Sequence, residues 1–267
     1  MGVGSISGNI TSLTAFNSDL FNGTYSYIEI PHNDAQLGAN LTNGFTISAW
    51  INPRSIGETT GRIFDKSSST NGDNGFTFFI DSTNNRLGLL INNGNKAISA
   101  VSSIPFGTWK HVLITILSTQ LASFYVNGSL SGTANQDLVQ GIATITTTNV
   151  MRIGNPSSST GRTFDGSIRS VKMWNRVLSQ KEIIEDYRGN VSTDGLIHYF
   201  KLGGDYADYG SVGVAASEIS GCIAGLFETN LPPVISGSLA VSTISGSFLM
   251  CDLAGGQILS VGIEDLA

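Results

Sequence analysis

Charged residues are scarce in this sequence, and so are segments rich in the residues that favour long helices. Only 13% of the 267 residues are Asp, Glu, Lys or Arg, and Lys, Glu and Ala-rich stretches are rare. Instead there are 32 glycines and many Ser, Thr and Asn residues. This composition favours short β-strands joined by tight turns.

Positive charge is in short supply as well. The formal net charge is −6 and the isoelectric point is near 4.9, and no cluster of Lys and Arg offsets this locally, so we expect no nucleic-acid partner. No apolar run approaches the length of about 20 residues that crosses a bilayer, so we expect no membrane insertion. The opening residues, MGVGSISGNI, lack the basic start and apolar core of a secretory signal, and we expect no export by that route.

Cysteine is nearly absent. Cys222 and Cys251 are far apart, with no second pair and no nearby His, which excludes the ligand spacing of a zinc site. We interpret them as free thiols, and the sequence leaves open whether they meet.

Short apolar runs bounded by Gly, Asn, Pro or Ser recur from residue 21 to 216. In FTISAWI, residues 45–51, apolar side chains alternate with Thr46, Ser48 and Trp50, which predicts a half-buried antiparallel strand. The pair Asn127-Gly128 tolerates the positive φ angles of a two-residue hairpin. Many closely spaced strands with one convincing helix predict an all-β sandwich of two antiparallel sheets.

The one convincing helix follows the last long strand-like run. Ser179 and Glu182 have the spacing of a capping box, and Ile183, Ile184 and Tyr187 share one side. A helix this short is marginal in water. We therefore expect its apolar side to dock across the end or back of a sheet.

Three segments in a fixed order resemble one family: YIEIPHNDAQLGANLTNGFTISAWINP, GTWKHVLITILSTQLASFYVNGSLSG and FDGSIRSVKMWNRVLSQKEI. Their W-x-H-V, F-x-V-N-G and F-x-G-x-I motifs resemble those of the laminin G-like and pentraxin group of the concanavalin A-like lectin/glucanase superfamily. The resemblance covers residues 21–190. It implies a two-sheet antiparallel jelly roll, which often serves as a sugar-binding or adhesive module.

In several branches the resemblance also implies calcium at one rim of the sandwich. Asp73 and Asn74 stand where pentraxins place an Asp-Asn pair of ligands, and they are the candidate metal ligands here. The second, acidic ligand group of the family is replaced by Asn155, Pro156 and Ser157. Since calcium prefers about six to eight oxygens, half of the site is missing, and turn formation is the alternative interpretation of Asp73 and Asn74. We expect either no cofactor or calcium.

Enzymatic activity is not expected. Jelly-roll glycosidases place acidic residues at alternate positions of one strand, and no strand-like run here has that pattern. The nearest acidic group, Glu182, Glu185 and Asp186, is interpreted as the solvent face of the predicted helix. His111 lies within a strand-like run and is interpreted as a packed structural side chain.

Glycan contacts are expected from loops at strand ends and not from tryptophans. Trp50, Trp109 and Trp174 occupy positions that the family buries. The polar loops SSSTNGDNG, NNGNK and NPSSSTGR offer donors and acceptors instead. The candidate ligand-binding residues in these loops are Asn92, Asn93, Asn155 and Arg162.

The terminal segments differ in character from the predicted jelly roll. Ile-Ser-Gly recurs at 6–8, 219–221, 235–237 and 244–246, within segments that are too small to bury a core of their own. The predicted division is an N-terminal arm, 1–20, a jelly roll, 21–216, and a β-rich C-terminal arm, 217–267. We expect both arms to be sheltered by other subunits of a homo- or hetero-oligomeric assembly.

These expectations combine into one predicted function and one alternative. The predicted function is a non-catalytic structural and binding module of a large assembly, such as a capsid decoration or tail-associated protein on the surface of a bacteriophage virion, with a glycan-binding outer face. The alternative is a free, calcium-assisted lectin or adhesin, extracellular or at a cell surface, whose partners are cell-surface glycans.

Overall fold

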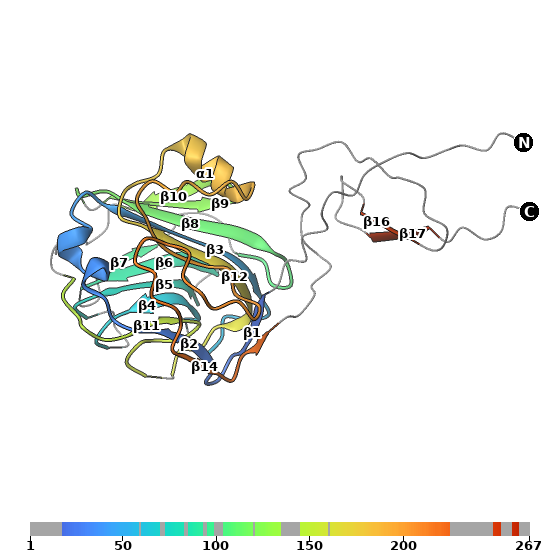
Figure 1. Ribbon diagram of the computed structural model, residues 1–267, viewed down its shortest axis with the longest axis horizontal. Helices are drawn as coiled ribbons and strands as arrows, with labels where there is room; N and C mark the ends of the chain where they lie inside the picture. Colours follow the sequence, from blue (N-terminus) through green and yellow to red (C-terminus); the bar gives the residue numbers. More distant parts are fainter. Residues whose placement is uncertain are drawn as a thin grey trace, which may run out of the picture. The chain divides into compact units, whose positions relative to one another are not determined.

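Two antiparallel β-sheets stacked face to face form the body of the chain (Figure 1). The computed structural model describes residues 18–58, 60–69, 73–82, 85–92, 95–98, 104–119, 121–134, 145–159, 161–224, 248–251 and 258–261. Within these residues every strand pair is antiparallel. The predicted all-β, two-sheet jelly-roll sandwich is confirmed.

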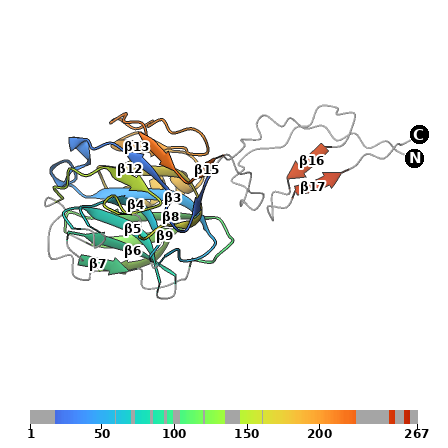
Figure 2. The ribbon, with the colours of Figure 1, turned by 90° about the horizontal axis from the view of Figure 1, so that it is seen from below.

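The strands of the two sheets interleave along the sequence, and the view from below shows the same two layers (Figure 2). The eight-stranded sheet runs in the order β10 (Ser129–Ala134), β9 (Ala122–Val126), β8 (Lys110–Ile116), β3 (Phe45–Pro53), β12 (Asp165–Trp174), β1 (Asp19–Asn22) and β15 (Ile223–Ala224), with β13 (Leu196–Phe200) paired to β12. The seven-stranded sheet runs β14 (Glu218–Ser220), β2 (Tyr27–Ile30), β11 (Met151–Ile153), β4 (Arg62–Lys66), β5 (Phe76–Asp81), β6 (Arg86–Ile91) and β7 (Asn95–Ile98). The described helices are α1 (Gln180–Tyr187) and the 3-10 turns η1 (Asp34–Gln36) and η2 (Gly38–Asn40).

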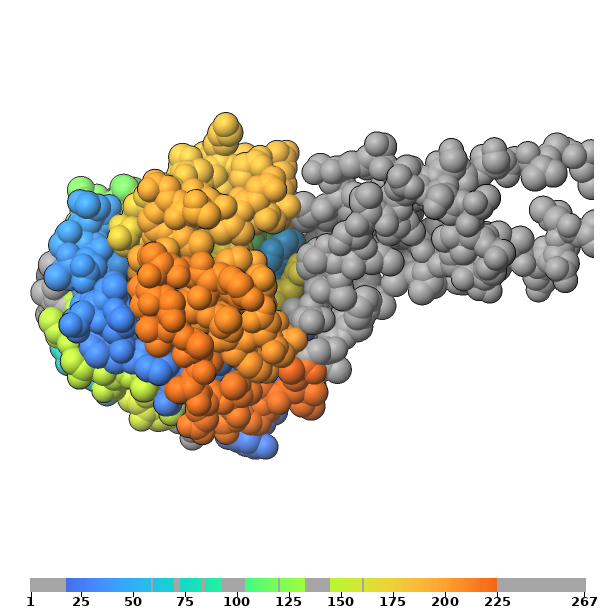
Figure 3. Space-filling model, viewed as in Figure 1, coloured from blue at the N-terminus to red at the C-terminus, as the bar shows by residue number. Residues whose placement is uncertain are grey.

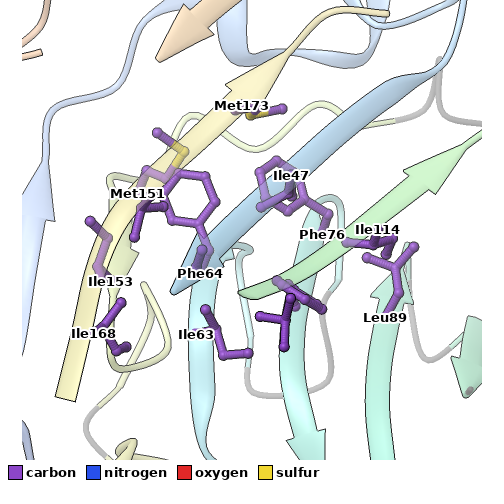
Figure 4. Close-up of a cluster of buried hydrophobic side chains, with 14 of the residues drawn as sticks. Ile47, Ile63, Phe64, Phe76, Leu89, Ile114, Met151, Ile153, Ile168 and Met173 are labelled. Carbon is purple, nitrogen blue, oxygen red and sulfur yellow. The ribbon is translucent and has the colours of Figure 1, made fainter. Parts of the chain in front are cut away.

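The apolar core lies between the two sheets (Figure 4). Ile47 and Ile114 reach it from the eight-stranded sheet, and Phe64, Phe76 and Leu89 reach it from the seven-stranded sheet, all with no exposed surface. Full burial of one such side chain contributes about 1.5–3 kcal/mol relative to exposure. The alternation of side chains along each strand therefore holds the layers together and points the remaining side chains outward.

Strand β3 is buried on both faces, although its alternation predicts a half-buried strand. On its outer face, Thr46 Oγ1 donates to the Arg176 carbonyl at 2.8 Å. Trp50 stacks against Tyr187 of α1 with ring centroids 5.6 Å apart. The prediction was wrong because the chain after β12 returns across this face, a long-range contact that alternation within one strand does not record.

The hairpin predicted at Asn127-Gly128 is confirmed between β9 and β10. Both residues have positive φ, 50° and 77°, which matches the turn chemistry of a two-residue hairpin. The Asn127 side-chain oxygen also accepts a hydrogen bond from the His111 backbone amide at 3.0 Å. The turn is therefore fixed to strand β8.

Helix α1 lies on the outer face of the eight-stranded sheet (Figure 1). The predicted capping box is confirmed, since Ser179 accepts from the Glu182 amide and Glu182 accepts from the Ser179 amide. Ile183 is fully buried and packs in a cluster with Leu113 and Trp174. The expected docking on the back of a sheet is confirmed.

Replacing Ile183 with Ala should lower the free energy of unfolding by about 2–5 kcal/mol, because the substitution leaves a cavity under the helix. Lys181→Ala is the matched control: Lys181 is exposed on the same helix, and its removal should change stability by less than about 0.5 kcal/mol. Urea denaturation of both variants measures the difference. Equal effects would contradict the docking.

Asp186 does not face solvent, and that part of the prediction is wrong. Its carboxylate accepts hydrogen bonds from Lys172 Nζ at 2.7 Å and from His111 Nε2 at 3.0 Å, and the residue is 1% exposed. Burial alone would raise the pKa of Asp186, but the charge of Lys172 and the His111 hydrogen bond outweigh burial and hold that pKa below its ordinary range. Asp186 follows Ile183 by one turn and thus shares its docked side.

His111 is a packed structural side chain, as predicted. It has no exposed surface and lies 5.5 Å from the Trp50 ring and 5.9 Å from the Tyr187 ring, centroid to centroid. Burial lowers the pKa of His111 below its ordinary 6.5, despite the opposing effect of Asp186. The cations Lys172 and Arg169 of β12 lower the pKa further.

This arrangement predicts an acid-sensitive fold. Because the folded-state pKa of His111 lies below the unfolded value near 6.5, the unfolded chain binds more protons there, and the free energy of unfolding should fall as pH drops below that value. Urea denaturation between pH 8 and pH 5 measures the slope. His111→Gln should reduce the slope over this range, and an unchanged slope in that variant would contradict the assignment.

A C-terminal strap, residues 218–224, closes one side of the sandwich. Its β14 pairs with β2 in one sheet and its β15 pairs with β1 in the other, and Figure 3 shows this orange segment against the blue N-terminal strands. Between β14 and β15, Gly221 has φ 62°, and an added Cβ would lie 2.4 Å from the Tyr25 ring, so glycine is required there. Cys222 is a free thiol, as predicted, and burial raises its pKa.

The strap corrects the predicted boundary. The sequence predicts that the jelly roll ends at residue 216 and that the following arm is sheltered by other subunits. The structure instead continues the two sheets to residue 224 with the chain's own strands. The expectation failed because β14 and β15 are too short to register as strands in the sequence pattern.

A second unit comprises residues 1–16 and 227–267, and within it β16 (Phe248–Cys251) pairs with β17 (Ile258–Val261). The Ile-Ser-Gly copies at 6–8, 235–237 and 244–246 lie outside the described residues. The sheltering of these segments by other subunits therefore stays a prediction. Within the described ranges, no helix has the length and apolar character to span a bilayer.

Candidate functional site

The outer faces of the two sheets differ. In the described chain α1 is the one α-helix, and it covers the eight-stranded sheet. On the seven-stranded sheet, the core-facing residues Ile28 and Ile153 alternate with side chains that point outward. Across this outer face the register aligns Glu218 with Glu29, and Glu29 with Arg152. The polar face of the seven-stranded sheet is therefore the candidate binding face.

The segment from Pro156 to Ser159 folds over the middle of this face. Ser157 Oγ donates to Asp65 Oδ1 at 2.7 Å, and the Ser157 amide donates to the same oxygen at 2.9 Å. The hydroxyls of Ser67 and Thr77 also donate to Asp65. A buried carboxylate is costly unless its oxygens are hydrogen-bonded, so Asp65 is the polar anchor of this loop.

Arg152 connects the loop to the sheet. Its Nε and Nη2 donate to Glu29 Oε2 at 3.0 and 2.8 Å, and its Nη1 donates to the carbonyls of Pro156 and Ser159 at 3.1 and 3.2 Å. Its guanidinium carbon lies 3.9 Å above the centre of the Tyr27 ring. Charge-assisted hydrogen bonds of this kind are stronger than neutral ones. Arg152 thus holds both the loop and one face of Tyr27.

Two tyrosines border this arrangement. Tyr27 donates its hydroxyl to Glu218 Oε1 at 2.7 Å, and that hydrogen bond raises the pKa of Tyr27. Tyr25 is 54% exposed and lies in a turn whose amides donate to the side-chain oxygen of Asn22. We call the group Tyr25, Tyr27, Glu29, Arg152 and Glu218 the tyrosine–arginine surface.

The loops expected to bind glycans lie side by side. The Ser67 amide donates to Ser157 Oγ at 2.7 Å, which joins the first predicted loop to the third. The Asn92 amide donates to the Gly75 carbonyl at 3.0 Å, which joins the first loop to the second. Backbone pairing at the strand ends therefore brings together segments that are far apart in the sequence.

The candidate ligand-binding residues within those loops have different environments. Asn155 is fully buried, and its amide donates to the Ser26 carbonyl and to Thr163 Oγ1, so it supports the loop from inside. Asn92 is 2% exposed, and Asn93 lies outside the described residues. Arg162 is partly exposed, and its Nη1 donates to Thr60 Oγ1 at 3.0 Å.

Asp73 and Asn74 do not fit a resident calcium ion. The Asp73 carbonyl accepts from Ser68, the Asn74 carbonyl accepts from the amides of Thr146 and Thr147, and the Asn74 amide group donates to Ser68 Oγ. One carboxylate oxygen of Asp73 is buried without a hydrogen-bond partner. However, no cluster of three or more His, Cys, Asp or Glu among the described residues could hold a metal ion, and calcium needs several oxygens.

Two other titratable clusters are structural. Asp208 accepts from His198 Nδ1 at 2.7 Å and from the Tyr199 amide, and both His198 and Asp208 side chains are buried. Lys66 donates to the Asn149 carbonyl at 2.7 Å, and burial lowers its pKa to about 8. Neither cluster is exposed to a ligand.

The three tryptophans are buried too, at 4%, 1% and 0% exposure for Trp50, Trp109 and Trp174, as predicted.

Sequence reasoning missed the tyrosine–arginine surface. A partial signal exists, because Tyr27 and Glu29 alternate with Ile28 and Ile30 and so share one face of a strand. Glu218 has no such signal, since only the pairing of β14 with β2 brings it beside Tyr27.

A family model described as the concanavalin A-like lectin/glucanases superfamily matches residues 22–184. This is more than half of the chain, and the protein therefore belongs to that superfamily. The resemblance found in the sequence motifs is confirmed. Among curated proteins, none matches this sequence.

Two similar solved structures share this fold, and a third is less similar. A Bacteroides ovatus protein described as a "putative carbohydrate binding protein" superposes with a TM-score of 0.54 at 16% identity; the match covers 86% of this chain and 63% of that one. The CBM40 of the Ruminococcus gnavus IT-sialidase gives 0.51 at 15% identity and covers 65% and 99%. A Limulus polyphemus pentraxin gives 0.46 at 18% identity and covers 84% and 95%.

The poor fit for calcium leads to a direct prediction. Calcium or a chelator should leave the melting temperature of the protein unchanged, because a ligand stabilises a fold only if it binds the folded state. A calcium site saturated at 100 times its dissociation constant would add about 2.7 kcal/mol. Differential scanning fluorimetry with calcium and with EDTA measures this, and a shift of several degrees would contradict the prediction.

Proposed function

We propose that this protein is a non-catalytic carbohydrate-binding module that binds glycans through the tyrosine–arginine surface. The observation that carries the proposal is an exposed aromatic ring, Tyr25, which lies against Gly221 at the end of β14, the strand whose Glu218 accepts a hydrogen bond from Tyr27. Sugar C–H faces pack on aromatic rings, and sugar hydroxyls donate to carboxylates. This surface offers both.

Membership of a superfamily of lectins and glucanases supports a glycan ligand, and so does the fold shared with the Bacteroides ovatus protein. Fold-level analogy is a weaker support than the surface itself, because one fold hosts many functions. The alternative considered from the sequence, a free lectin or adhesin, needs no assembly and agrees with this proposal. The calcium dependence of that alternative does not agree with the proposal, because Asp73 and Asn74 fit a metal poorly.

The carboxylates on this face are arranged for binding and not for hydrolysis. A glycosidase needs a general acid and a nucleophile or base that are both able to reach the sugar bond. Glu29 is held by Arg152, Asp65 is buried under the 156–159 loop, and Asp81 is paired with Arg86. Of these carboxylates and Glu218, only Glu218 is exposed. No second carboxylate among them is therefore free to act with Glu218 on a sugar bond.

A place for this module on a bacteriophage virion or another large assembly stays a prediction. That prediction depends on the terminal segments, and residues 1–17 and 225–247 of them lie outside the described residues. The strap, residues 218–224, already pairs with strands of the chain's own two sheets. A glycan-binding module at a cell surface and one on a virion would use the same surface, so the proposal stands for either setting.

A glycan array with the full chain tests the proposal. The wild-type protein should bind at least one class of oligosaccharide, and Tyr25→Ala together with Tyr27→Ala should weaken that binding by about tenfold or more, because truncation of an aromatic anchor removes its packing with the sugar ring. Tyr209→Ala is the matched control, since Tyr209 is 49% exposed outside this surface.

The control should bind like the wild type, and all variants should melt within a few degrees of it. If wild-type protein binds no glycan on the array, the proposed function is wrong. If the Tyr25 and Tyr27 variant binds as well as the Tyr209 variant, the glycan site lies elsewhere.

A further inference from the structure

The guanidinium of Arg152 has most of its hydrogen bonds already made: four of its five N–H donors are engaged within the protein. Every one of its nitrogens donates to the protein: Nε and Nη2 donate to Glu29, and Nη1 donates to two loop carbonyls. One face of the group is covered by the Tyr27 ring. Carboxylate and sulfate groups are recognised best by an arginine that offers paired N–H donors. Arg152 does not offer such a pair.

The charge of the tyrosine–arginine surface points the same way. Glu29 and Glu218 bring two negative charges and Arg152 brings one positive charge, so the described surface carries one excess negative charge. An acidic sugar would approach that charge with no unpaired cation among the five residues of the described surface to receive it, and like charges repel across a partly solvated surface. Hydroxyl groups, in contrast, can donate to Glu218, which is exposed.

We infer that the surface binds uncharged glycans and discriminates against glycans that carry carboxylate or sulfate groups. The inference rests on the proposed function and names the ligand class of the same site. Arg152 is a positioning residue, because it acts through the 156–159 loop and Tyr27. Glu29 is the specificity-determining residue, because it occupies the donors with which Arg152 would otherwise bind an acidic sugar.

The test is a paired glycan array in which each neutral oligosaccharide is printed beside its sialylated, sulfated or uronic-acid derivative. Wild-type full-length protein should bind neutral members more strongly than acidic partners by about two- to fivefold, the range expected for one exposed charge interaction. The preference should shrink as salt screens the charges.

Glu29→Gln removes the excess negative charge and replaces the charged acceptor of two Arg152 donors with a neutral amide oxygen, so the ratio of acidic to neutral binding should rise by about two- to fivefold. Glu185→Gln is the charge-matched control: Glu185 lies on α1, where it pairs with Arg188, and its ratio should equal that of the wild type. If Glu29→Gln fails to fold, Glu218→Gln removes one charge from the same surface and should raise the ratio too.

The outcomes separate the two proposals. Binding of acidic glycans as strongly as neutral ones by the wild type would overturn this inference and leave the proposed function standing. A neutral preference that neither glutamate variant changes would also overturn it, because the preference would arise elsewhere. Absence of binding to every printed glycan would overturn the proposed function, and the inference with it.

Discussion

Each sheet of this sandwich has to bury one face in the common core, and that requirement leaves each sheet with a second face. Apolar side chains alternate along the strands, so burial of Ile47 or Phe64 in the core points their neighbours away from it. The two outer faces are covered in different ways. Helix α1 and the chain that precedes it cover the outer face of the eight-stranded sheet, whereas polar and aromatic side chains occupy the outer face of the seven-stranded sheet.

Charged side chains are buried under α1 on the first face, whereas the second face also carries charge that is partly exposed to solvent. Under α1, Asp186 accepts hydrogen bonds from Lys172 and His111, and the three side chains are at most 2% exposed. Loss of Lys172 would leave the buried charge of Asp186 without an opposite charge beside it. On the opposite face, the Arg152 and Glu29 side chains are 15% and 18% exposed. There a ligand hydroxyl can reach the surface, and the guanidinium of Arg152 holds the 156–159 loop through two carbonyls.

Much of the fold could be predicted because its determinants are local. The Ser179 and Glu182 capping box and the Asn127-Gly128 turn each depend on residues a few positions apart. The burial of β3 on both faces, the inward orientation of Asp186 and the addition of β14 to β2 depend on pairings between distant segments. For the same reason the predicted loops included polar residues such as Asn155 that support the fold, and omitted Glu218, which pairing of β14 brings to the surface.

Hydrogen–deuterium exchange of the full chain with and without its best-binding glycan tests the central claim most directly. The ligand should slow exchange in residues 25–29, around Arg152, in residues 156–159 and in β14, and should leave α1 unchanged. Protection confined to the loop of Asp73 and Asn74, or to the outer face of the eight-stranded sheet, would contradict the claim that the tyrosine–arginine surface of the seven-stranded sheet is the binding surface.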